Sequence, residues 1–216
     1  KWLHIFEQTH TNAFRLVHGE GDDLPGLIVD IYDDVLVMQA HSIGMYLALP
    51  EIAKAAEKVL GNRISAIYDK SKDCLPAQFA YPLQNRWLLG EKEQVSIVEN
   101  NIRFHIDVVK GQKTGFFLDQ RDNRSLLGTY SKGKSVLNTF CYSGGFSLAA
   151  LQVGATQVDS VDVSSNAMQL LEDNLLLNEY SAENHTSYTD DVMKFLRKEE
   201  VPQYDIVVLD PPAFAK

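Results

Sequence analysis

The sequence predicts an α/β protein in which a small α+β unit precedes a parallel sheet. From about Asp122 onward, short apolar runs alternate with helical patterns, and such alternation is typical of a parallel sheet covered by helices. In the first half, neighbouring apolar runs are instead joined by short polar turns, which favours antiparallel pairing. The chain has 216 residues, of which 45% are hydrophobic, enough for the cores of two small domains. We place the boundary between them after residue 110, giving domains 1–110 and 111–216.

Composition narrows the class of protein. No run of 18 apolar residues and no signal-peptide pattern occurs, so the sequence suggests neither a membrane span nor export. Cys74 and Cys141 give no disulfide framework and fit a reducing cytoplasm, where we place the protein. The six histidines are scattered without ligand-like spacing, so we expect no metal. The net charge of −9 argues against a protein that coats nucleic acid, because phosphate neutralisation dominates such binding.

The first domain is expected to be a sheet with one long helix. Pro25-Gly26 has the order of a type II turn. Asn100-Asn101 suits the positive φ of a hairpin turn. A helix over residues 44–60 should end at Gly61 and either begin or kink near Pro50. Asp69 to Leu89 shows no clear pattern. The predicted strands are Leu27 to Tyr32, Val35 to Ala40, Ile64 to Tyr68, Val95 to Val98 and Ile102 to Val109.

The second domain is expected to alternate helix and strand. The predicted helices are Arg121 to Tyr130, Phe146 to Val153, a helix capped by Ser164 or Ser165 that runs to Asn178, and Val192 to Lys198 capped by Asp190 or Asp191. The predicted strands are Ser135 to Asn138, Gln157 to Val161, Thr186 to Tyr188 and Asp205 to Leu209. Ligands of such folds bind beyond the carboxyl ends of the strands. Five candidates fall there: Asn138, Gly144, Asp162, Asp191 and Asp210.

Two segments at this edge contain the residues most typical of a ligand site. Between the first two strands, a turn with Gly144 and Gly145 allows a close approach of backbone to a ligand. Asp162 follows at roughly the 20-residue spacing of ribose-binding acids. Later, the fourth strand runs into Asp210-Pro-Pro-Ala-Phe, where two prolines make a stiff bend. The alternatives are a turn that only closes a tight connection and a bend that only ends a strand. No G-x-G-x-x-G pattern occurs, which disfavours a dinucleotide.

These motifs carry a family resemblance. N-x-F-x-Y-S-G-G-F, V-D-V-S and D-P-P-x-F together resemble the class I S-adenosylmethionine-dependent methyltransferases, which have a Rossmann-like sheet. GQKTGFFLDQRDNR, residues 111–124, resembles the hairpin of bacterial large-subunit rRNA cytosine-C5 methyltransferases that carry a PUA domain. LPGLIVDIYDD, residues 24–34, resembles their middle domain. The resemblance covers nearly the whole chain and implies S-adenosylmethionine as cofactor, 23S rRNA as substrate and a role in rRNA processing by RNA methylation.

The resemblance also implies roles for the site residues. Gln120, Arg121 and Asn138 would hold the amino-acid end of the cofactor, since a guanidinium can grip a carboxylate with two bonds. Phe140 and Gly144 would line the backbone cradle. Asp162 would accept from both ribose hydroxyls. Val163 and Ser164 would flank the adenine, and Asp191 would accept from its amino group, with a helix N-cap as the alternative or additional role. Asn138 replaces the acid common in class I enzymes but matches this family. Phe116 and Phe117 would close off the cofactor, although a plain hairpin before a capping Asp122 is the alternative.

Catalysis is left unassigned within the chain. Methylation of cytosine C5 needs a thiolate that adds to C6. Neither Cys141, in the turn, nor Cys74, in the first domain, follows the Pro-Pro bend. The resemblance implies that the nucleophile belongs to a later Ser-Cys-Ser-like motif after Lys216 and that a PUA domain precedes Lys1, so we expect a sheet truncated after its fourth strand. This chain would then at most bind cofactor. Asp210 could position the base and also belongs to the cofactor set.

RNA contact needs basic side chains despite the acidic balance. The best local candidates are Lys110, Lys113, Arg121, Arg124, Lys132 and Lys134, with a solvated charged surface as the alternative. Other functions stay open: nitrogen methylation of guanine or adenine, which needs no cysteine; a non-catalytic module that binds the cofactor; and, more remotely, an NAD-dependent enzyme. The target nucleotide, the oligomeric state, with a homodimer as one option, and the source of RNA affinity are not readable from the sequence.

Overall fold

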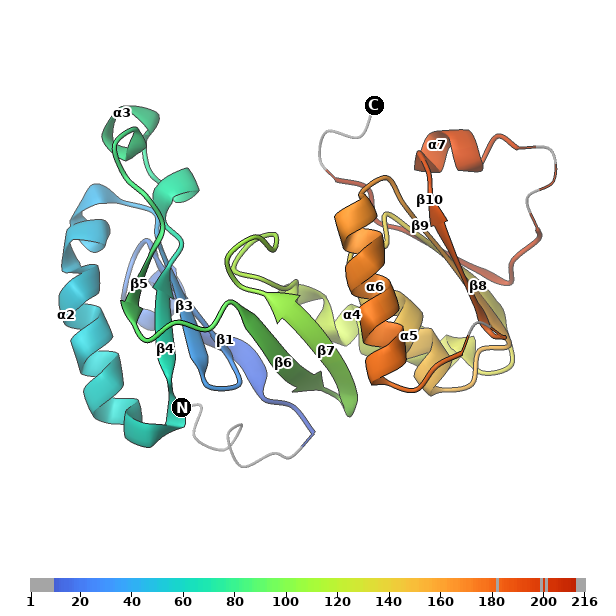
Figure 1. Cartoon of the computed structure of the whole chain (residues 1–216), viewed down its shortest axis with the longest axis horizontal. Coiled ribbons are helices and arrows are strands. Elements are labelled where there is room, and N and C mark those ends of the chain that lie inside the picture. The colour runs from blue at the N-terminus through green and yellow to red at the C-terminus, as the bar shows by residue number, and fades with distance from the viewer. Residues whose placement is uncertain (1–9, 182, 199, 201, 213–216) are drawn as a thin grey trace. The chain divides into compact units, whose positions relative to one another are not determined.

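The computed structural model describes residues 10–181, 183–198, 200 and 202–212 (Figure 1). Ala213 and Phe214 of the predicted bend lie outside this range. The chain divides into two compact units, the first formed by Lys1–Asn101 with His105–Leu118 and the second by Ile102–Phe104 with Asp119–Lys216. The boundary after residue 110 stays a prediction; the contacts group residues 111–118 with the first unit.

A five-stranded sheet with the order β1-β2-β3-β4-β5 forms the core of the first unit. Its strands are β1 (Ala13–His18), β2 (Leu27–Tyr32), β3 (Val35–Ala40), β4 (Ala66–Asp69) and β5 (Arg86–Leu89). All neighbours are antiparallel except β3 and β4. The predicted bounds of β2 and β3 are confirmed, and β4 begins two residues later than predicted. Parallel neighbours need a crossover connection, and a helix supplies it here.

The crossover helix α2 (Ile43–Leu60) is one continuous helix with Pro50 inside it. It begins before the proline, where the Ser42 hydroxyl caps it by accepting from the Met45 backbone N–H, and it ends at Gly61 as predicted. Tyr46, Leu49 and Ala53 are among its buried residues and join the core cluster of the sheet, along which α2 lies in Figure 1. Packing of this apolar face stabilises the helix despite the proline.

The segment without a sequence pattern, residues 69–89, contains only short elements. These are a 3-10 turn η3 (Lys72–Cys74), the one-turn helix α3 (Ala77–Ala80) and the strand β5. Further 3-10 turns are η1 (Gly19–Asp22) and η2 (Gly61–Arg63). The next hairpin, β6 (Gln94–Glu99) with β7 (Ile102–Asp107), turns at Asn100 and Asn101, whose φ angles are 51° and 67°. The predicted positive-φ turn is confirmed.

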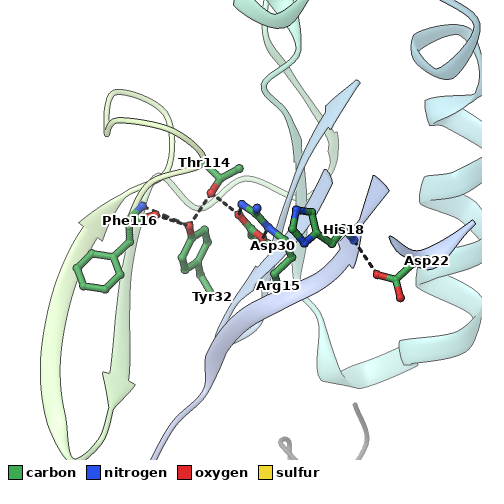
Figure 2. A network of polar contacts seen from close by, with 7 residues as sticks. All are labelled: Arg15, His18, Asp22, Asp30, Tyr32, Thr114 and Phe116. Carbon is green, nitrogen blue, oxygen red and sulfur yellow. Dashed lines mark hydrogen bonds and ion pairs between the residues drawn. The ribbon is translucent and has the colours of Figure 1, made fainter. Parts of the chain in front are cut away.

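A buried polar network holds residues 114–116 to the sheet of the first unit (Figure 2). Asp30, whose side chain is fully buried, receives two bonds from Arg15, at 2.8 and 3.0 Å. The Thr114 hydroxyl donates to Oδ2 of this carboxylate at 2.6 Å and lies 2.7 Å from the Tyr32 hydroxyl. Tyr32 also accepts from the Phe116 backbone N–H at 3.2 Å. We call these five residues the arginine–aspartate network.

The second unit is built on a parallel four-stranded sheet with the order β10-β9-β8-β11. Its strands are β8 (Ser135–Thr139), β9 (Gln157–Asp162), β10 (His185–Thr189) and β11 (Ile206–Leu209). The predicted α/β alternation with a parallel sheet is confirmed. The connecting elements are η4 (Leu118–Gln120), α4 (Arg121–Ser131), α5 (Gly145–Gln152), α6 (Ser165–Leu177) and α7 (Val192–Phe195).

Helices cover this sheet on both faces. Ser147 of α5 bonds to Asn138 and Ser160, whose side chains leave one face of β8 and β9. The opposite face carries Leu137 and Val161, which pack with α7. Figure 1 shows α5 and α6 running along the strands. Ser164 caps α6 and Asp191 caps α7, two of the four predicted caps, while α7 is shorter than predicted and ends at Phe195.

Among the described residues, no helix combines the length and apolar character that crossing a bilayer would take.

Candidate ligand site at the carboxyl edge of the parallel sheet

The strand registers bring the predicted site residues to one edge of the second unit. Thr139 pairs with Val161, and Leu209 pairs with Thr139, so β8, β9 and β11 finish together. On the other side Asp162 pairs with Thr189 of β10. The residues that follow these strand ends therefore line a common edge, which is where parallel α/β sheets bind ligands.

The loop from β8 to α5, residues 140–144, is fixed by bonds to β9 and α6 and by a bond within the loop. The Cys141 N–H donates to the Val161 carbonyl at 3.1 Å, and the Asn174 side chain donates to the Ser143 carbonyl at 3.1 Å. Within the loop, the Gly144 N–H donates to the Cys141 carbonyl at 2.9 Å. A loop held at so many points is preorganised, so a ligand that binds there has little ordering left to impose.

Backbone strain concentrates in the same loop. Phe140 and Tyr142 have φ angles of 53° and 47°, although neither is glycine. A left-handed non-glycine residue costs about 1–2 kcal/mol, and such residues cluster at ligand sites. Phe140 also packs beside Leu137 and Val161 on the α7 face of the sheet. Its ring therefore contributes to the core, and its role in a cofactor cradle stays a prediction.

The structure gives the glycine pair a packing reason. Gly144 has φ 79°, and a Cβ there would lie 2.0 Å from Cδ1 of the buried Leu171. A Cβ on Gly145 would lie 2.9 Å from Cδ of Arg124. Both glycines thus let the start of α5 pack against its neighbours, α6 and α4. A close approach of a ligand to the backbone of this turn stays a prediction.

Asp162, the last residue of β9, is oriented by the loops on either side. Its Oδ2 accepts from the Tyr142 N–H at 3.0 Å, and its Oδ1 accepts from the Ser164 N–H at 2.9 Å. A carboxylate oxygen can accept about two hydrogen bonds, so each oxygen retains capacity for one ribose hydroxyl. Asp162 is partly exposed, and the geometry fits a vicinal diol.

Gln120 and Asp210 come together although they lie far apart in the sequence. The Gln120 amide donates to Asp210 Oδ2 at 3.2 Å, and its Oε1 accepts from the Asn123 amide at 2.7 Å. Arg121 follows as the first residue of α4 and is partly exposed. The structure thus brings Gln120 to the acid that precedes the Pro-Pro bend, and the roles of Gln120, Arg121 and Asn138 at the amino-acid end stay a prediction.

The predicted adenine residues follow the second and third strands. Val163 is 71% exposed, and this apolar side chain is available to a flat ring. Ser164 caps α6 by accepting from the Ala167 N–H at 3.3 Å. Asp191 caps α7 by accepting from the Lys194 N–H at 2.8 Å, so its capping role is present. Whether Asp191 also binds adenine stays a prediction.

The two cysteines are poor nucleophiles where they stand. Cys141 is 6% exposed, and burial, with the Asp162 charge as a second cause, raises the pKa of its thiol. Burial also raises the pKa of Cys74, followed by the nearby Asp73 and Asp69 carboxylates. Because the thiolate is the reactive form, the chemistry expected of a cytosine methyltransferase finds no thiolate among the described residues. This agrees with leaving the nucleophile unassigned.

One RNA candidate is wrong and several polar residues were missed. Arg124 is only 4% exposed and packs on Gly145, so it is not a surface contact for RNA. Ser147, Ser160 and His185 are buried beneath Asn138 and joined by hydrogen bonds, and the sequence analysis assigned none of them. The sequence offers little signal for them, because Ser147 lies on a helix and the strand that carries His185 has the polar sequence HTSYT.

Comparison with known proteins agrees with this geometry. The family of S-adenosylmethionine-dependent methyltransferases matches residues 14–216. Proteins named ribosomal RNA large subunit methyltransferase I are 41% identical in Shewanella frigidimarina and 39% in Tolumonas auensis, each over 98% of this chain and 54% of the relative. The chain therefore spans about half the length of these relatives.

Solved structures show the same fold. A crystal structure of SMU.776, assigned as a methyltransferase and complexed with SAH, superimposes with a TM-score of 0.86 at 30% identity and covers 100% of this chain and 55% of that one. A crystal structure of M. jannaschii tRNA m1G37 methyltransferase has a TM-score of 0.66 at 20% identity over 87% of this chain and 52% of that one, a likeness of fold alone. Taken with the loop at the carboxyl edge, these matches show that the chain belongs to the S-adenosylmethionine-dependent methyltransferase family.

Proposed function

We propose that the protein methylates 23S rRNA with S-adenosylmethionine and that its target atom is C5 of a cytosine. The single observation that carries the proposal is Asp162, held by two backbone N–H groups at the carboxyl edge with acceptor capacity left on both oxygens. The rRNA substrate is supported by the relatives named for large-subunit rRNA methylation, which are about 40% identical. Such an enzyme would act in the bacterial cytoplasm.

The cofactor would be held by residues already placed at this edge. Asp162 would bind the ribose, Val163 and Ser164 would flank the adenine, and Asp191 would accept from the adenine amino group. Gln120, Arg121 and Asn138 would bind the amino-acid end. Phe140 and Gly144 would line the backbone between them. When bound, the cofactor supplies an electrophilic methyl group.

The target base is proposed to lie by Asp210. This side chain is exposed, and Gln120 donates to it at 3.2 Å, so the carboxylate has a fixed direction and remaining acceptor capacity. It can accept from an exocyclic amino group of a base. The nucleophilic thiolate is assigned to none of the described residues.

A second candidate is nitrogen methylation of guanine or adenine. One observation favours it: both thiols in the described residues have raised pKa values, and transfer to a nitrogen needs no thiolate. Asp210 would then act by hydrogen-bonding the base.

Nucleoside analysis of 23S rRNA separates the candidates. We expect rRNA from a strain lacking the gene to lose one 5-methylcytidine and to regain it when the intact protein is restored. Loss of a methylated purine instead would establish the second candidate. Unchanged rRNA, with S-adenosylmethionine still bound by the purified protein, would indicate a non-catalytic binding module.

A further inference from the structure

A row of buried polar side chains crosses the parallel sheet beneath the candidate site. Asn138 on β8 lies opposite Ser160 on β9, and Ser160 lies opposite Ser187 on β10. Ser147 of α5 and His185 of β10 complete the row. Asn138 is 1% exposed, Ser147 and Ser160 are 0% exposed, and His185 is 6% exposed. A buried polar group without a partner costs about 1–3 kcal/mol, so such a row persists only if its members bond to one another.

Hydrogen bonds join the row into a continuous path. The Asn138 Nδ2 lies 2.8 Å from the Ser147 hydroxyl, which lies 2.7 Å from the Ser160 hydroxyl. The Ser160 hydroxyl lies 2.8 Å from Nε2 of His185. On the far side, Nδ1 of His185 lies 3.5 Å from the Ser187 hydroxyl, which donates to the exposed carboxylate of Glu172 on α6. We call these six residues the serine–histidine chain.

The two end groups of the serine–histidine chain determine the direction in which its members donate hydrogen bonds. The Asn138 Nδ2 group can only donate, and an ionised carboxylate at Glu172 can only accept. Each hydroxyl between them therefore donates toward Glu172. Nε2 of His185 must accept, so the ring is neutral with its proton on Nδ1. In this state every buried group of the chain is satisfied.

We propose that His185 is a positioning residue: acting through the serine–histidine chain, it fixes which end of the Asn138 carboxamide faces the bound cofactor. The inference rests on the proposed function, in which Asn138 binds the amino-acid end. With Nδ2 held on Ser147, the oxygen of the carboxamide is directed to the other side of the group. An oxygen accepts from the ammonium of an amino acid, whereas an NH₂ group in its place would repel it.

Protonation of His185 would reverse the direction of hydrogen-bond donation from His185 to Asn138. An imidazolium donates from both nitrogens, so Ser160 would accept from it and donate to Ser147. Ser147 would then donate to Asn138, which favours the carboxamide turned by a half rotation. Neutral His185 therefore selects the orientation that suits the ammonium group.

The surroundings keep His185 neutral. Burial lowers its pKa, and the carboxylates of Glu172 on α6 and Asp159 on β9 oppose part of that change. Among the described residues, these two carboxylates are the charged groups that act on the ring. The correct orientation of Asn138 is thus present at neutral pH and is lost on acidification.

Two ligands distinguish positioning from general damage. S-adenosylhomocysteine carries the amino-acid end, and 5′-methylthioadenosine lacks it. In the intact protein we expect Ser160→Ala and His185→Phe to weaken S-adenosylhomocysteine binding about fivefold, the equivalent of one net hydrogen bond, and to leave methylthioadenosine binding unchanged. The matched control is Ser131→Ala, which removes another fully buried serine hydroxyl of the same unit, one that donates to the Leu127 carbonyl. It should change neither affinity.

Titration calorimetry at several pH values completes the test. Wild-type affinity for S-adenosylhomocysteine should hold near about pH 6.5, the ordinary histidine pKa, and fall only at lower pH, because burial lowers the pKa of His185. His185→Phe should show no such fall. Equal losses for both ligands, or no loss for either, would overturn the positioning role alone. A wild-type protein that binds neither ligand would overturn the proposed function and this inference with it.

Discussion

The two units of this protein bury their polar groups in different ways. The arginine–aspartate network of the first unit is charged: Asp30 is fully buried and takes two bonds from Arg15 and one from Thr114. The serine–histidine chain of the second unit contains only neutral groups until it reaches the exposed Glu172. The arginine–aspartate network thus buries a charged pair, and the serine–histidine chain buries a row of dipoles that point the same way.

The difference has consequences for stability and function. Removing one partner of a buried charge pair leaves the other charge poorly solvated, which is strongly destabilising. Removing one hydroxyl from the serine–histidine chain lowers the free energy of unfolding by about 1 kcal/mol. Its main effect is on the direction in which the remaining groups donate. The arginine–aspartate network is therefore expected to hold residues 114–116 in place. The serine–histidine chain is expected to orient the Asn138 carboxamide.

The largest expected effect is that of Asp30→Asn. Loss of the charge should lower the free energy of unfolding by about 3 kcal/mol, at the lower end for a buried pair because the Arg15 side chain is 32% exposed. Chemical denaturation of the intact protein measures this.

The control is Asp34→Asn, which removes a partly exposed pair with Lys92 whose side chains are 31% and 39% exposed. It should cost less than about 1 kcal/mol. Equal losses for Asp30→Asn and Asp34→Asn would show that the charge buried in the first unit has no special weight.

Tyr32→Phe should have an intermediate effect. It deletes the hydroxyl that meets Thr114 at 2.7 Å and the Phe116 N–H at 3.2 Å, but leaves the ion pair intact. We expect a loss of about 1–2 kcal/mol, because a buried N–H loses its acceptor. Amide hydrogen exchange should locate the change, with faster exchange at Phe116. Unchanged protection there would mean that Tyr32 does not hold this segment.

The smallest expected effect is a dependence of stability on pH in the second unit. Burial lowers the pKa of His185, so as pH falls below 6.5 the unfolded chain takes up a proton that the folded chain does not. Stability should therefore fall with acid and be flat above that range, with a slope of at most about 1.4 kcal/mol per pH unit. His185→Gln should lack this contribution. An identical pH profile in both proteins would exclude it.

Sequence patterns predicted local structure well where the pattern of a single helix, strand or turn determines it. Apolar runs separated by polar turn residues predicted the bounds of β2 and β3, and turn residues located the hairpin at Asn100. The helix α2 was harder, because Pro50 is unfavourable locally and only packing on the sheet keeps the helix continuous. Packing partners distant in the chain are not visible in a local pattern.

In the candidate site too, residues that follow from local pattern were predicted, and residues that depend on distant packing were missed. Asp162 was predicted because strand order places it at the sheet edge, and its bonds to Tyr142 and Ser164 follow from that place. Arg124 was mistaken for a surface residue because only the fold shows that α4 turns it toward Gly145. The serine–histidine chain requires the register of three strands and the position of α5, which no single segment encodes.

The central claim is that the carboxyl edge of the parallel sheet binds an adenosyl ligand through Asp162. Isothermal titration of the intact protein with S-adenosylhomocysteine tests it most directly, using Asp162→Asn beside Asp173→Asn, an exposed acid on α6. The account predicts that Asp162→Asn weakens binding about 30-fold, as expected for loss of a charged acceptor, while Asp173→Asn binds like the wild type. Wild-type affinity in Asp162→Asn, with unchanged melting temperature, would contradict it.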